Sequence, residues 1–485
     1  MLQKKNIGFE FEKIAASDPD FPAIVAADIT VSYGKLWRIA ESFAVRMREN
    51  GIGRTSIVAV STTDMIVSAA TMLATCLVGA QYVVPDRKMV EAGVINPTHF
   101  LRSPETQGID GVNYTLMDQY WAPAFADKVV PEPFEGFASI DDPWWILSTS
   151  GTTGDAKYLY LSQRLAFDRS VAVKGDFITG ETRVCILFLC SARPFFVRAM
   201  ASFMNKCTII DSFDPTFWHK NGVNFVCASP HLMVDWLGKN DLETKMDRLQ
   251  VSGAKLNDPD AKLLLENFHQ VEDVYGSSET NKSYVNLKSL NGLGEVQTVG
   301  VKKDSEIEIV SEDGTKIENG TSGVVRIRNA YMVVGYINNP SASKKAFRGG
   351  WFYPGDIGRF TKDKALEIIG RTDAVINLDG VKIDPSRIDT VFKSVEGVSH
   401  AACFLDPDES SGPRLMAFLV LENTEESDTI VRNAQSTCVA KFGARITPQT
   451  ILVVPDFPLT NDGVPKRAEC RTLARSLVGS AQWRQ

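Results

Sequence analysis

The sequence has few of the residues that bind metals or form cross-links. Its 485 residues include five histidines and eight cysteines, and no two cysteines form a C-x-x-C pair. Zinc sites and disulfide frameworks both need such residues at short, regular spacings. We therefore expect neither kind of site, and the pattern favours reduced thiols in a cytoplasmic location.

The sequence also lacks the long apolar runs that cross membranes, which need about 18 or more consecutive apolar residues. The nearest candidate, residues 65–84, is interrupted by a serine, two threonines and a glycine, and it predicts a buried helix followed by a strand. The first fifteen residues have no apolar core of the secretory kind, so we expect no signal segment. The formal net charge is −7, which argues against a general nucleic-acid-binding role.

What the chain does have is an ordinary globular balance, with 44% hydrophobic and 23% charged residues, over a length that implies two or more domains. Short β-rich runs alternate with helix-like segments through the first 300 residues, which predicts a mostly parallel sheet covered by helices. Residues 305–329 then alternate with period two around Asp-Gly and Asn-Gly turns, which predicts antiparallel hairpins. The last hundred residues indicate a smaller α+β unit.

We therefore predict an α/β fold with three parts. A large multi-sheet N-terminal domain of mostly parallel α/β layers includes a small antiparallel, barrel-like part, and a small α+β C-terminal domain follows it. The boundary is predicted near residues 370–373, where a glycine and polar residues separate two apolar runs. The two predicted domains are thus residues 1–371 and residues 372–485.

Residues 147–159, LSTSGTTGDAKYL, form a stretch of small residues directly after an apolar run. Its glycines let backbone N–H groups approach an anion, its hydroxyls add donors, and Lys157 adds a positive charge. A P-loop would end in Gly-Lys-Ser/Thr, whereas this lysine stands between Ala156 and Tyr158, so a P-loop ATPase is not expected. The alternative to an anion cradle is a polar turn between two strands.

The stretch TSGTTGDAK resembles the phosphate-binding loop of the adenylate-forming superfamily, which includes AMP-forming acyl-CoA and aryl-acid synthetases and peptide-synthetase adenylation domains. The family form is close to T-S-G-T-T-G-x-P-K-G, and this sequence departs from it at Ala156 and Tyr158. The resemblance implies that the loop binds the phosphates of ATP. The residues it implicates are Thr149, Ser150, Gly151, Thr152, Thr153, Gly154 and Lys157.

Further stretches resemble the family's nucleotide motifs, in the family's order. VSGAKL resembles the segment beside the adenine, and VYGSSET at 274–280 resembles the aromatic-glycine-Ser/Thr-acid motif. The resemblance implies that Tyr275 stacks on the adenine, that Ser278 lies near the α-phosphate or acyl group, and that Glu279 binds magnesium, a cation that prefers oxygen ligands. The other residues implicated are Gly253, Ala254, Gly276 and Ser277. Taken alone, Tyr275 has the alternative role of a core aromatic and Glu279 that of a surface acid.

The next two matches lie in the second half of the chain. GVVRIRNAYMVVGYINNP resembles G-E-L-x-V-R-G…G-Y-x-N-x-P, and GGWFYPGDIGRF resembles G-W-F-x-T-G-D. The second implies that Asp356 accepts hydrogen bonds from the ribose hydroxyls. GRTDAVINLDGVKI resembles the family's hinge segment. It implies that Arg371 contacts ribose or phosphate, that Asp373 is the hinge, and that Gly380 lies at the tunnel for a pantetheine thiol.

The last family motif is P-x-T-x-x-G-K-x-x-R, and this chain has PLTNDGVPKR at residues 458–467. Val464 stands at the usual lysine position, and Lys466 follows two residues later. In an extended segment a two-residue shift keeps a side chain on the same face. We therefore predict Lys466 as the catalytic lysine; the alternative is a surface lysine. With Thr152 and Glu279 it completes the implied catalytic set.

The family's acid-binding region corresponds to CILFLCSARPFFVRAM. Phe188, Cys190 and Arg193 are the candidates there for the substrate pocket, together with His231 of ASPHLM. The region has no acid, which weakens an α-amino-acid substrate because a buried ammonium needs a carboxylate partner. Arg193 and Arg198 are candidates for binding a second acidic group on the substrate.

The resemblance implies an ATP-dependent carboxylate ligase that forms an acyl-adenylate, releases pyrophosphate and passes the acyl group to a thiol. Its implied requirements are ATP, Mg²⁺ and coenzyme A or phosphopantetheine, and its implied partners are a small carboxylic acid and an acyl carrier protein. Residues 1–371 would bind ATP and the acid, and residues 372–485 would form the mobile domain. Two alternatives stay open: adenylation with a non-thiol acceptor or an unusual oxyanion, and a catalytically weak nucleotide-binding protein.

Overall fold

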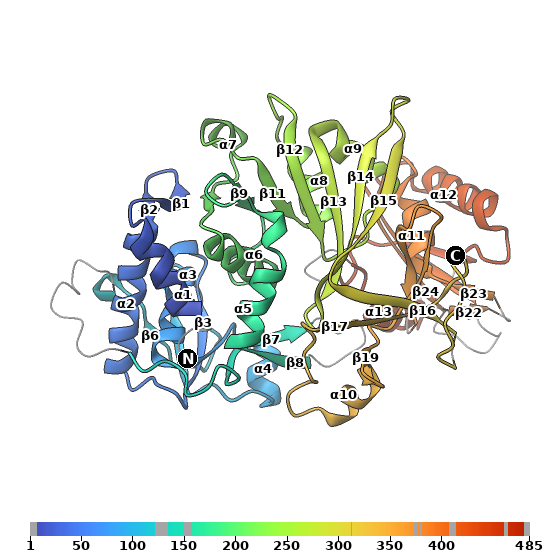
Figure 1. The fold of residues 1–485 in the computed structure, drawn as a ribbon. Helices are drawn as coiled ribbons and strands as arrows, with labels where there is room; N and C mark the ends of the chain where they lie inside the picture. Colours follow the sequence, from blue (N-terminus) through green and yellow to red (C-terminus); the bar gives the residue numbers. More distant parts are fainter. Residues whose placement is uncertain are drawn as a thin grey trace.

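The structure is a computed structural model, and it describes residues 7–121, 134–149, 157–311, 313–372, 376–378, 381–406, 414–459 and 464–479. Five sheets with helices packed on them make up the described chain (Figure 1). The predicted α/β fold is confirmed, with mostly parallel sheets in the first part, a smaller antiparallel sheet after residue 305, and a small mixed unit at the C-terminal end.

The largest sheet has nine strands, of which the central ones are parallel and the two ends antiparallel. In spatial order its strands are β15 (Val296–Lys302), β14 (Asn281–Leu290), β13 (Phe268–Ser277), β12 (Met246–Ser252), β11 (Phe225–Ala228), β9 (Arg183–Ile186), β10 (Thr208–Asp211), β1 (Pro22–Ala26) and β2 (Thr30–Ser32). The helices between its parallel strands are α6 (Arg193–Met204), α7 (Pro215–Lys220), α8 (Pro230–Leu237) and α9 (Asp258–Asn267).

The second sheet has six strands and ends in an antiparallel hairpin. Its strands in spatial order are β6 (Thr115–Leu116), β5 (His99–Arg102), β3 (Ile57–Ser61), β4 (Gln81–Val83), β7 (Pro143–Thr149) and β8 (Lys157–Ser162). The other helices of this half of the chain are α1 (Ile7–Ser17), α2 (Tyr33–Glu49), α3 (Met65–Val78), α4 (Arg87–Ala92), η2 (Gln119–Trp121), α5 (Gln163–Ala172) and η4 (Lys174–Asp176). Side chains of α1, α2, α3, α5 and α6 share one hydrophobic core with both sheets.

The third sheet is antiparallel, as the period-two pattern predicts. It comprises β16 (Ser305–Val310), β17 (Gly323–Asn329), β18 (Phe347–Arg348), β19 (Trp351–Phe352), β20 (Asp356–Phe360) and β21 (Leu366–Arg371), with α10 (Pro340–Ala346) preceding β18. In Figure 1 the labelled strands β17 and β19 and helix α10 lie below the long strands β12–β15.

The C-terminal unit contains two small sheets and three helices. These elements are β22 (Ile376–Leu378), β23 (Val381–Ile383), α11 (Pro385–Lys393), β24 (Val398–Leu405), β25 (Leu415–Leu421), α12 (Ser427–Phe442), β26 (Thr450–Val453) and α13 (Arg467–Gly479). In the described residues, strands up to Arg371 pair among themselves, and strands from Ile376 onward pair among themselves.

The segment 65–84 forms a buried helix followed by a strand, as its interrupted apolar run predicts. The Asp64 side chain caps α3 by accepting hydrogen bonds from the N–H groups of Ile66 and Val67, at 2.7 and 2.9 Å. Helix α3 ends at Gly79, whose φ of 74° is left-handed. Among the described helices none is both long and apolar enough to cross a membrane. All eight cysteines are free and buried.

Gly79 should be the least replaceable glycine at the end of a helix. A Cβ atom there would lie 2.3 Å from the carbonyl oxygen of Gly136, in addition to the left-handed backbone. Gly51 is the matched control, since it has a similar φ of 76° but no atom within 4 Å of its Cβ position. We expect Gly51→Ala to lower the free energy of unfolding by about 1 kcal/mol and Gly79→Ala by about 3 kcal/mol. Urea unfolding measures both, and equal losses would contradict the predicted steric conflict.

Candidate active site

The predicted phosphate loop joins the two strands of the β7–β8 hairpin. Thr149 at the end of β7 pairs with Lys157 at the start of β8. The residues between them, including Ser150, Gly151, Thr152, Thr153 and Gly154, lie outside the described residues. Anion binding by the loop stays a prediction, and both its flanking residues are held in register by the hairpin.

Tyr158, the departure from the family's glycine, turns away from the loop. Its side chain is buried and packs in a cluster with Ala59, Val83, Met89 and Ile146. Burial, together with the charge of Asp86, raises the pKa of the Tyr158 hydroxyl to about 12. Because successive side chains of a strand point to opposite faces, this inward tyrosine places Lys157 on the other face of β8.

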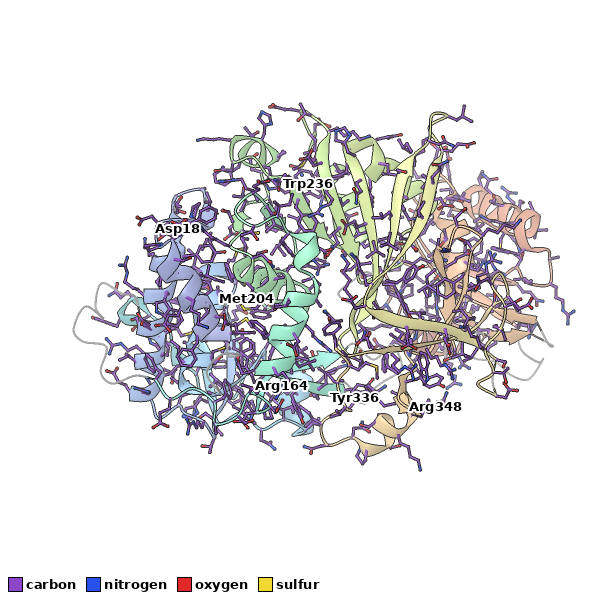
Figure 2. The ribbon with its side chains drawn as sticks, viewed as in Figure 1. Asp18, Arg164, Met204, Trp236, Tyr336 and Arg348 are labelled. Atoms are coloured by element: carbon purple, nitrogen blue, oxygen red, sulfur yellow. The ribbon has the colours of Figure 1, made fainter. Side chains whose placement is uncertain are left out.

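Lys157 lies beside an aromatic residue that contacts the predicted magnesium ligand. The Lys157 ammonium is 5.3 Å from the centre of the Tyr336 ring, and the Tyr336 hydroxyl donates a hydrogen bond of 2.7 Å to Glu279. Burial and the negative charge of Glu279 raise the pKa of Tyr336 well above its usual value, so the phenol stays protonated and donates. Figure 2 labels Tyr336 between the β7–β8 hairpin and the long strands.

Glu279 occupies the tip of the β13–β14 hairpin, and its side chain is only 6% exposed. The tip is tight because a Cβ atom at Gly276 would lie 2.3 Å from the carbonyl oxygen of Asn281. The Ser277 hydroxyl accepts a hydrogen bond of 3.2 Å from the Glu279 N–H. Two residues of the VYGSSET motif therefore have separate roles. Gly276 permits the close turn, and Ser277 orients Glu279.

A buried arginine, Arg169 of α5, fixes this tip. It is 2% exposed and donates to the carbonyl oxygens of Ser278 at 2.9 Å and Glu279 at 3.0 Å. Its Nε and Nη2 also donate to the carbonyl oxygen of Tyr331, at 3.0 and 2.6 Å. Sequence reasoning missed Arg169, since a lone arginine in a helix gives no sign of partners more than one hundred residues away. Tyr336 was missed as well, although it stands in the quoted GYINNP motif.

Asp356 and Arg371 meet as cross-strand neighbours of β20 and β21. Arg371 Nη1 lies 3.2 Å from Asp356 Oδ1 and donates to the Pro354 carbonyl oxygen at 2.8 Å. The Tyr275 hydroxyl donates to Asp356 Oδ2 at 2.6 Å. The residues predicted to bind adenine and ribose are therefore brought together, and the phenol of Tyr275 orients the carboxylate; adenine stacking by its ring stays a prediction.

Electrostatics join the Asp356 group to the Glu279 group. Burial and the charge of Asp356 raise the pKa of Tyr275, and the positive charge of Arg371 opposes that rise. The same guanidinium opposes the rise at Tyr336. The Arg371 charge therefore acts on both phenols, which links the Asp356–Arg371 pair electrostatically to the Tyr336–Glu279 pair.

Gly253 and Ala254 follow directly after the last residue of β12, and Gly253 has a left-handed φ of 95°. Strand β12 is parallel to β13, whose end carries Tyr275 and Ser277. The carboxyl ends of neighbouring parallel strands lie at one edge of a sheet, which is where open α/β sheets bind ligands. The predicted adenine segment is therefore placed at the same edge as the hairpin tip.

The candidates for the acid pocket are placed less uniformly. Cys190 is buried, and its carbonyl oxygen accepts a hydrogen bond of 3.1 Å from Ser68; burial and the charges of Asp64 and Asp211 raise its thiol pKa to about 12. His231 is the second residue of α8. Its side chain is 43% exposed, and its Nε2 lies 3.4 Å from the Asp235 carboxylate. The side chain of Arg193 lies outside the described residues.

The roles predicted for residues of the C-terminal part of the chain stay predictions. Lys466 directly precedes α13, and its ammonium lies 3.5 Å from Glu469 of that helix. Val464, at the usual lysine position, is 39% exposed. Asp373 and Gly380 lie outside the described residues.

The donor set suits magnesium better than a metal held by protein alone. Within the described ranges no group of three histidine, cysteine or acidic side chains is arranged to hold a metal. Magnesium is commonly bound through one or two carboxylates plus the phosphate oxygens of a substrate. The single buried carboxylate of Glu279 fits that requirement.

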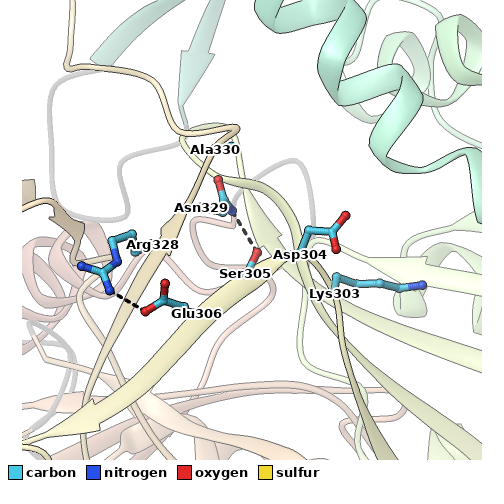
Figure 3. Close-up of a pocket in the computed structure, with 7 residues that line it drawn as sticks. All are labelled: Lys303, Asp304, Ser305, Glu306, Arg328, Asn329 and Ala330. Carbon is cyan, nitrogen blue, oxygen red and sulfur yellow. Dashed lines mark hydrogen bonds and ion pairs between the residues drawn. The ribbon is translucent and has the colours of Figure 1, made fainter.

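An open pocket of about 610 Å³ is lined by residues 303–306 and 328–330 (Figure 3). Asn329, on its wall, donates hydrogen bonds of 2.9 Å to the Thr280 carbonyl oxygen and to Ser305. Arg328 and Glu306 pair across it at 2.5 Å. Because its lining is charged and largely self-paired, we do not assign the acyl group to it.

Two sequence models of one enzyme family match the chain. The AMP-binding enzyme model matches residues 101–337, and the AMP-binding enzyme C-terminal domain model matches residues 387–463. Among curated relatives, the oxalate–CoA ligase of Arabidopsis thaliana is 32% identical over 171 residues, which are 35% of this chain and 33% of that protein. The probable non-canonical nonribosomal peptide synthetase CymA of Salinispora arenicola is 23% identical over 471 residues, or 93% of this chain and 6% of that protein.

The first relatives are thus matched over 6% to 34% of their own length. Solved structures share the fold over nearly the whole chain. The o-succinylbenzoate CoA synthetase MenE of Bacillus subtilis, in complex with an acyl-adenylate intermediate, has a TM-score of 0.82 at 18% identity, covering 95% of this chain and 97% of that one. The amide bond synthetase McbA of Marinactinospora thermotolerans has a TM-score of 0.78 at 18% identity, covering 96% and 99%.

The matched models cover both predicted parts of the chain, and the fold agrees with that of the solved structures from end to end. Four of the residues that carry the resemblance lie in two contact groups, Lys157 and Glu279 around Tyr336, and Asp356 with Arg371. The chain belongs to the AMP-binding enzymes of the adenylate-forming superfamily.

Proposed function

We propose that this protein is an AMP-forming, ATP-dependent acid–thiol ligase. The main support is the joint position of a buried carboxylate suited to magnesium, a lysine at the end of the predicted phosphate loop, and an Asp–Arg pair suited to ribose and phosphate. Each matches a different part of Mg·ATP. Their convergence on one site favours nucleotide chemistry over the alternative of separate structural roles.

In the proposed first step, a carboxylate oxygen of the acid attacks the α-phosphorus of ATP. The bond from that phosphorus to the bridging oxygen breaks, pyrophosphate leaves, and an acyl-adenylate forms. In the second step a thiol loses its proton and attacks the acyl carbon, and AMP leaves with the electrons of the acyl–oxygen bond. Positioning and charge stabilisation supply most of the catalysis in such transfers.

The chain's own residues have distinct proposed roles. Residues 149–154, with the hydroxyl of Thr152 among them, and Lys157 bind the phosphates, Gly253, Ala254, Tyr275, Gly276 and Ser277 border the adenosine, and Asp356 and Arg371 hold the ribose. Ser278 and Lys466 lie at the α-phosphate. Bound magnesium, held through Glu279, would neutralise phosphate charge. Arg169 and Tyr336 are positioning residues that keep this carboxylate oriented before the nucleotide arrives.

We further propose that residues 1–371 and 372–485 are domains that move about Asp373, with Gly380 admitting the thiol arm. Separate strand pairing on the two sides of this boundary supports the division. Domain closure of this kind commonly separates two half-reactions. The proposed partners are a small carboxylic acid and coenzyme A or the pantetheine of a carrier protein. Eight free, buried thiols support a cytoplasmic location.

A non-thiol acceptor is the second candidate. Val464 at the usual lysine position and the fold shared with an amide bond synthetase favour it. The acceptor is identified by AMP release from enzyme that has been loaded with acid and ATP. We expect coenzyme A or a pantetheinylated carrier to trigger release, and release by a simple amine with none by either thiol would favour the second candidate.

Carboxylate-dependent exchange of pyrophosphate into ATP tests the first half-reaction and its lysine. We expect Lys466→Ala to lower exchange by about 100-fold, because a preorganised donor to the transition state is lost. Lys441→Ala, in the exposed last turn of α12, is the control and should leave exchange unchanged.

Adding Val464→Lys to the Lys466→Ala variant should restore exchange, because the two positions share a face of the extended segment. Wild-type exchange in Lys466→Ala would remove Lys466 from the mechanism. Intact ATP binding without exchange for any acid in a broad panel would contradict the ligase proposal itself.

Arg169→Ala should weaken magnesium binding indirectly, because Arg169 is not itself a proposed ligand of the metal. Loss of the bonds to the Ser278 and Glu279 carbonyl groups frees the hairpin tip, so we expect the half-saturating magnesium concentration in the exchange assay to rise about tenfold. Arg164→Ala is the matched control, since Arg164 lies on the same helix but pairs with Asp141 at the surface. A loss of thermal stability with an unchanged magnesium dependence would show that Arg169 is structural only.

A further inference from the structure

Arg198 of α6 is a buried guanidinium with an incomplete set of partners. The residue is 9% exposed. Its Nη2 donates to the Ser252 hydroxyl at 2.9 Å, and its Nη1 donates to the Pro194 carbonyl oxygen at 3.1 Å. Its Nε is buried without a hydrogen-bond partner. A guanidinium carries five N–H donors; the Ser252 hydroxyl, the Pro194 carbonyl oxygen and the neutral Cys227 thiol engage some of them, and the Nε–H is left over.

Among the described residues, no carboxylate forms an ion pair with the Arg198 guanidinium. A guanidinium stays protonated in proteins, and a buried charge is costly unless it is paired. The centre of the Phe188 ring lies 5.0 Å from the guanidinium carbon, and the Arg198 charge and a hydrogen bond from it oppose the burial that raises the pKa of the neutral Cys227 thiol. An aromatic face stabilises a cation but cannot accept the in-plane N–H groups.

Arg248 of β12 is a comparable arginine that does have a carboxylate partner. It is also stacked on an aromatic ring, at 3.9 Å from the centre of Phe225. Unlike Arg198 it has a carboxylate, Glu272, at 3.4 Å. Arg248 lies near the start of β12 and Ser252 is the last residue of that strand. The two arginines therefore serve opposite ends of one strand, and only the one at the carboxyl end lacks an acid.

That end of the strand is where the proposed substrate binds. Ser252 immediately precedes Gly253 of the predicted adenine segment, and Phe188 follows β9 in the predicted acid pocket. The next strand, β13, ends in the motif that carries Glu279. The unpaired donors of Arg198 are thus at the sheet edge that the acyl group must share with the nucleotide.

We propose that Arg198 binds a second carboxylate of the acid substrate, so that the enzyme activates dicarboxylic acids. This inference rests on the proposed ligase function and specifies its substrate class. One carboxylate of the substrate would react with ATP, and the other would accept hydrogen bonds from the free Nε–H and the remaining N–H of Nη2. Ser252 and Pro194 hold the guanidinium in place, and Phe188 covers one of its faces.

Matched pairs of acids test the proposal by pyrophosphate exchange. Succinate, glutarate and phthalate are each compared with the corresponding half-amide, which has nearly the same shape but lacks the second charge. We expect kcat/KM for at least one diacid to exceed that for its half-amide by about 100-fold or more, because the half-amide leaves a buried charge unpaired.

The variant Arg198→Met keeps the length of the side chain and removes the charge. We expect the diacid to half-amide ratio of kcat/KM to fall by about 100-fold. Arg248→Met is the control, and its ratio should equal that of the wild type. Should Arg198→Met not fold, Ser252→Ala, which removes the hydroxyl that holds Nη2, gives a smaller fall in the same ratio.

The exchange assay distinguishes failure of the diacid proposal from failure of the ligase proposal. Monocarboxylic acids or half-amides activated as well as diacids, or a ratio unchanged in Arg198→Met, would overturn the proposal and leave the ligase function standing. An absence of exchange with every acid, mono or di, alongside intact ATP binding would overturn both.

Discussion

The candidate active site depends on one buried guanidinium. Hairpin tips expose carbonyl groups that have no partner in the sheet, and such groups must be satisfied when they are buried. Arg169 satisfies those of Ser278 and Glu279 and also that of Tyr331, so a single side chain joins α5, the β13–β14 tip and the strand exit that leads to Tyr336. The same segments are also joined by bonds from the Val333 N–H to the Glu279 carbonyl oxygen and from Asn329 to the Thr280 carbonyl oxygen, and Arg169 adds the connection to α5.

The charges of the site alternate in sign and are joined by neutral phenols. Lys157 and Glu279 are both in contact with Tyr336, and Arg371 and Tyr275 both bind Asp356. Burial and neighbouring carboxylates keep both tyrosines protonated, so each is a donor over the physiological pH range. The carboxylates are therefore oriented in the absence of nucleotide, which reduces the reorganisation that binding requires.

The sequence was sufficient to predict the fold class, the antiparallel part after residue 305 and two pairs of nucleotide-binding candidates that lie close together, Lys157 with Glu279 and Asp356 with Arg371. Alternating strands and helices, period-two hairpins and the ordered motifs are local features of the sequence. Each depends on residues that are close together in the chain, so it can be recognised without the tertiary structure. Arg169 and Arg198 were harder to interpret, since their meaning comes from partners on distant elements. No sequence pattern singles out the first, and the second could be named only as a candidate beside Arg193 until its burial and its unpartnered Nε distinguished it.

Tyr158 makes the β7–β8 hairpin, which carries the predicted phosphate loop, sensitive to the register of its strand pairing. Side chains on β8 alternate between core and site, so a slip of one residue in the pairing with β7 would move the tyrosine out of its apolar cluster and bring Lys157 into it. Burying an ammonium and exposing an aromatic ring are both unfavourable. A change of register in this hairpin is therefore costly, and Tyr158, one of the two residues that depart from the family pattern, enforces the register.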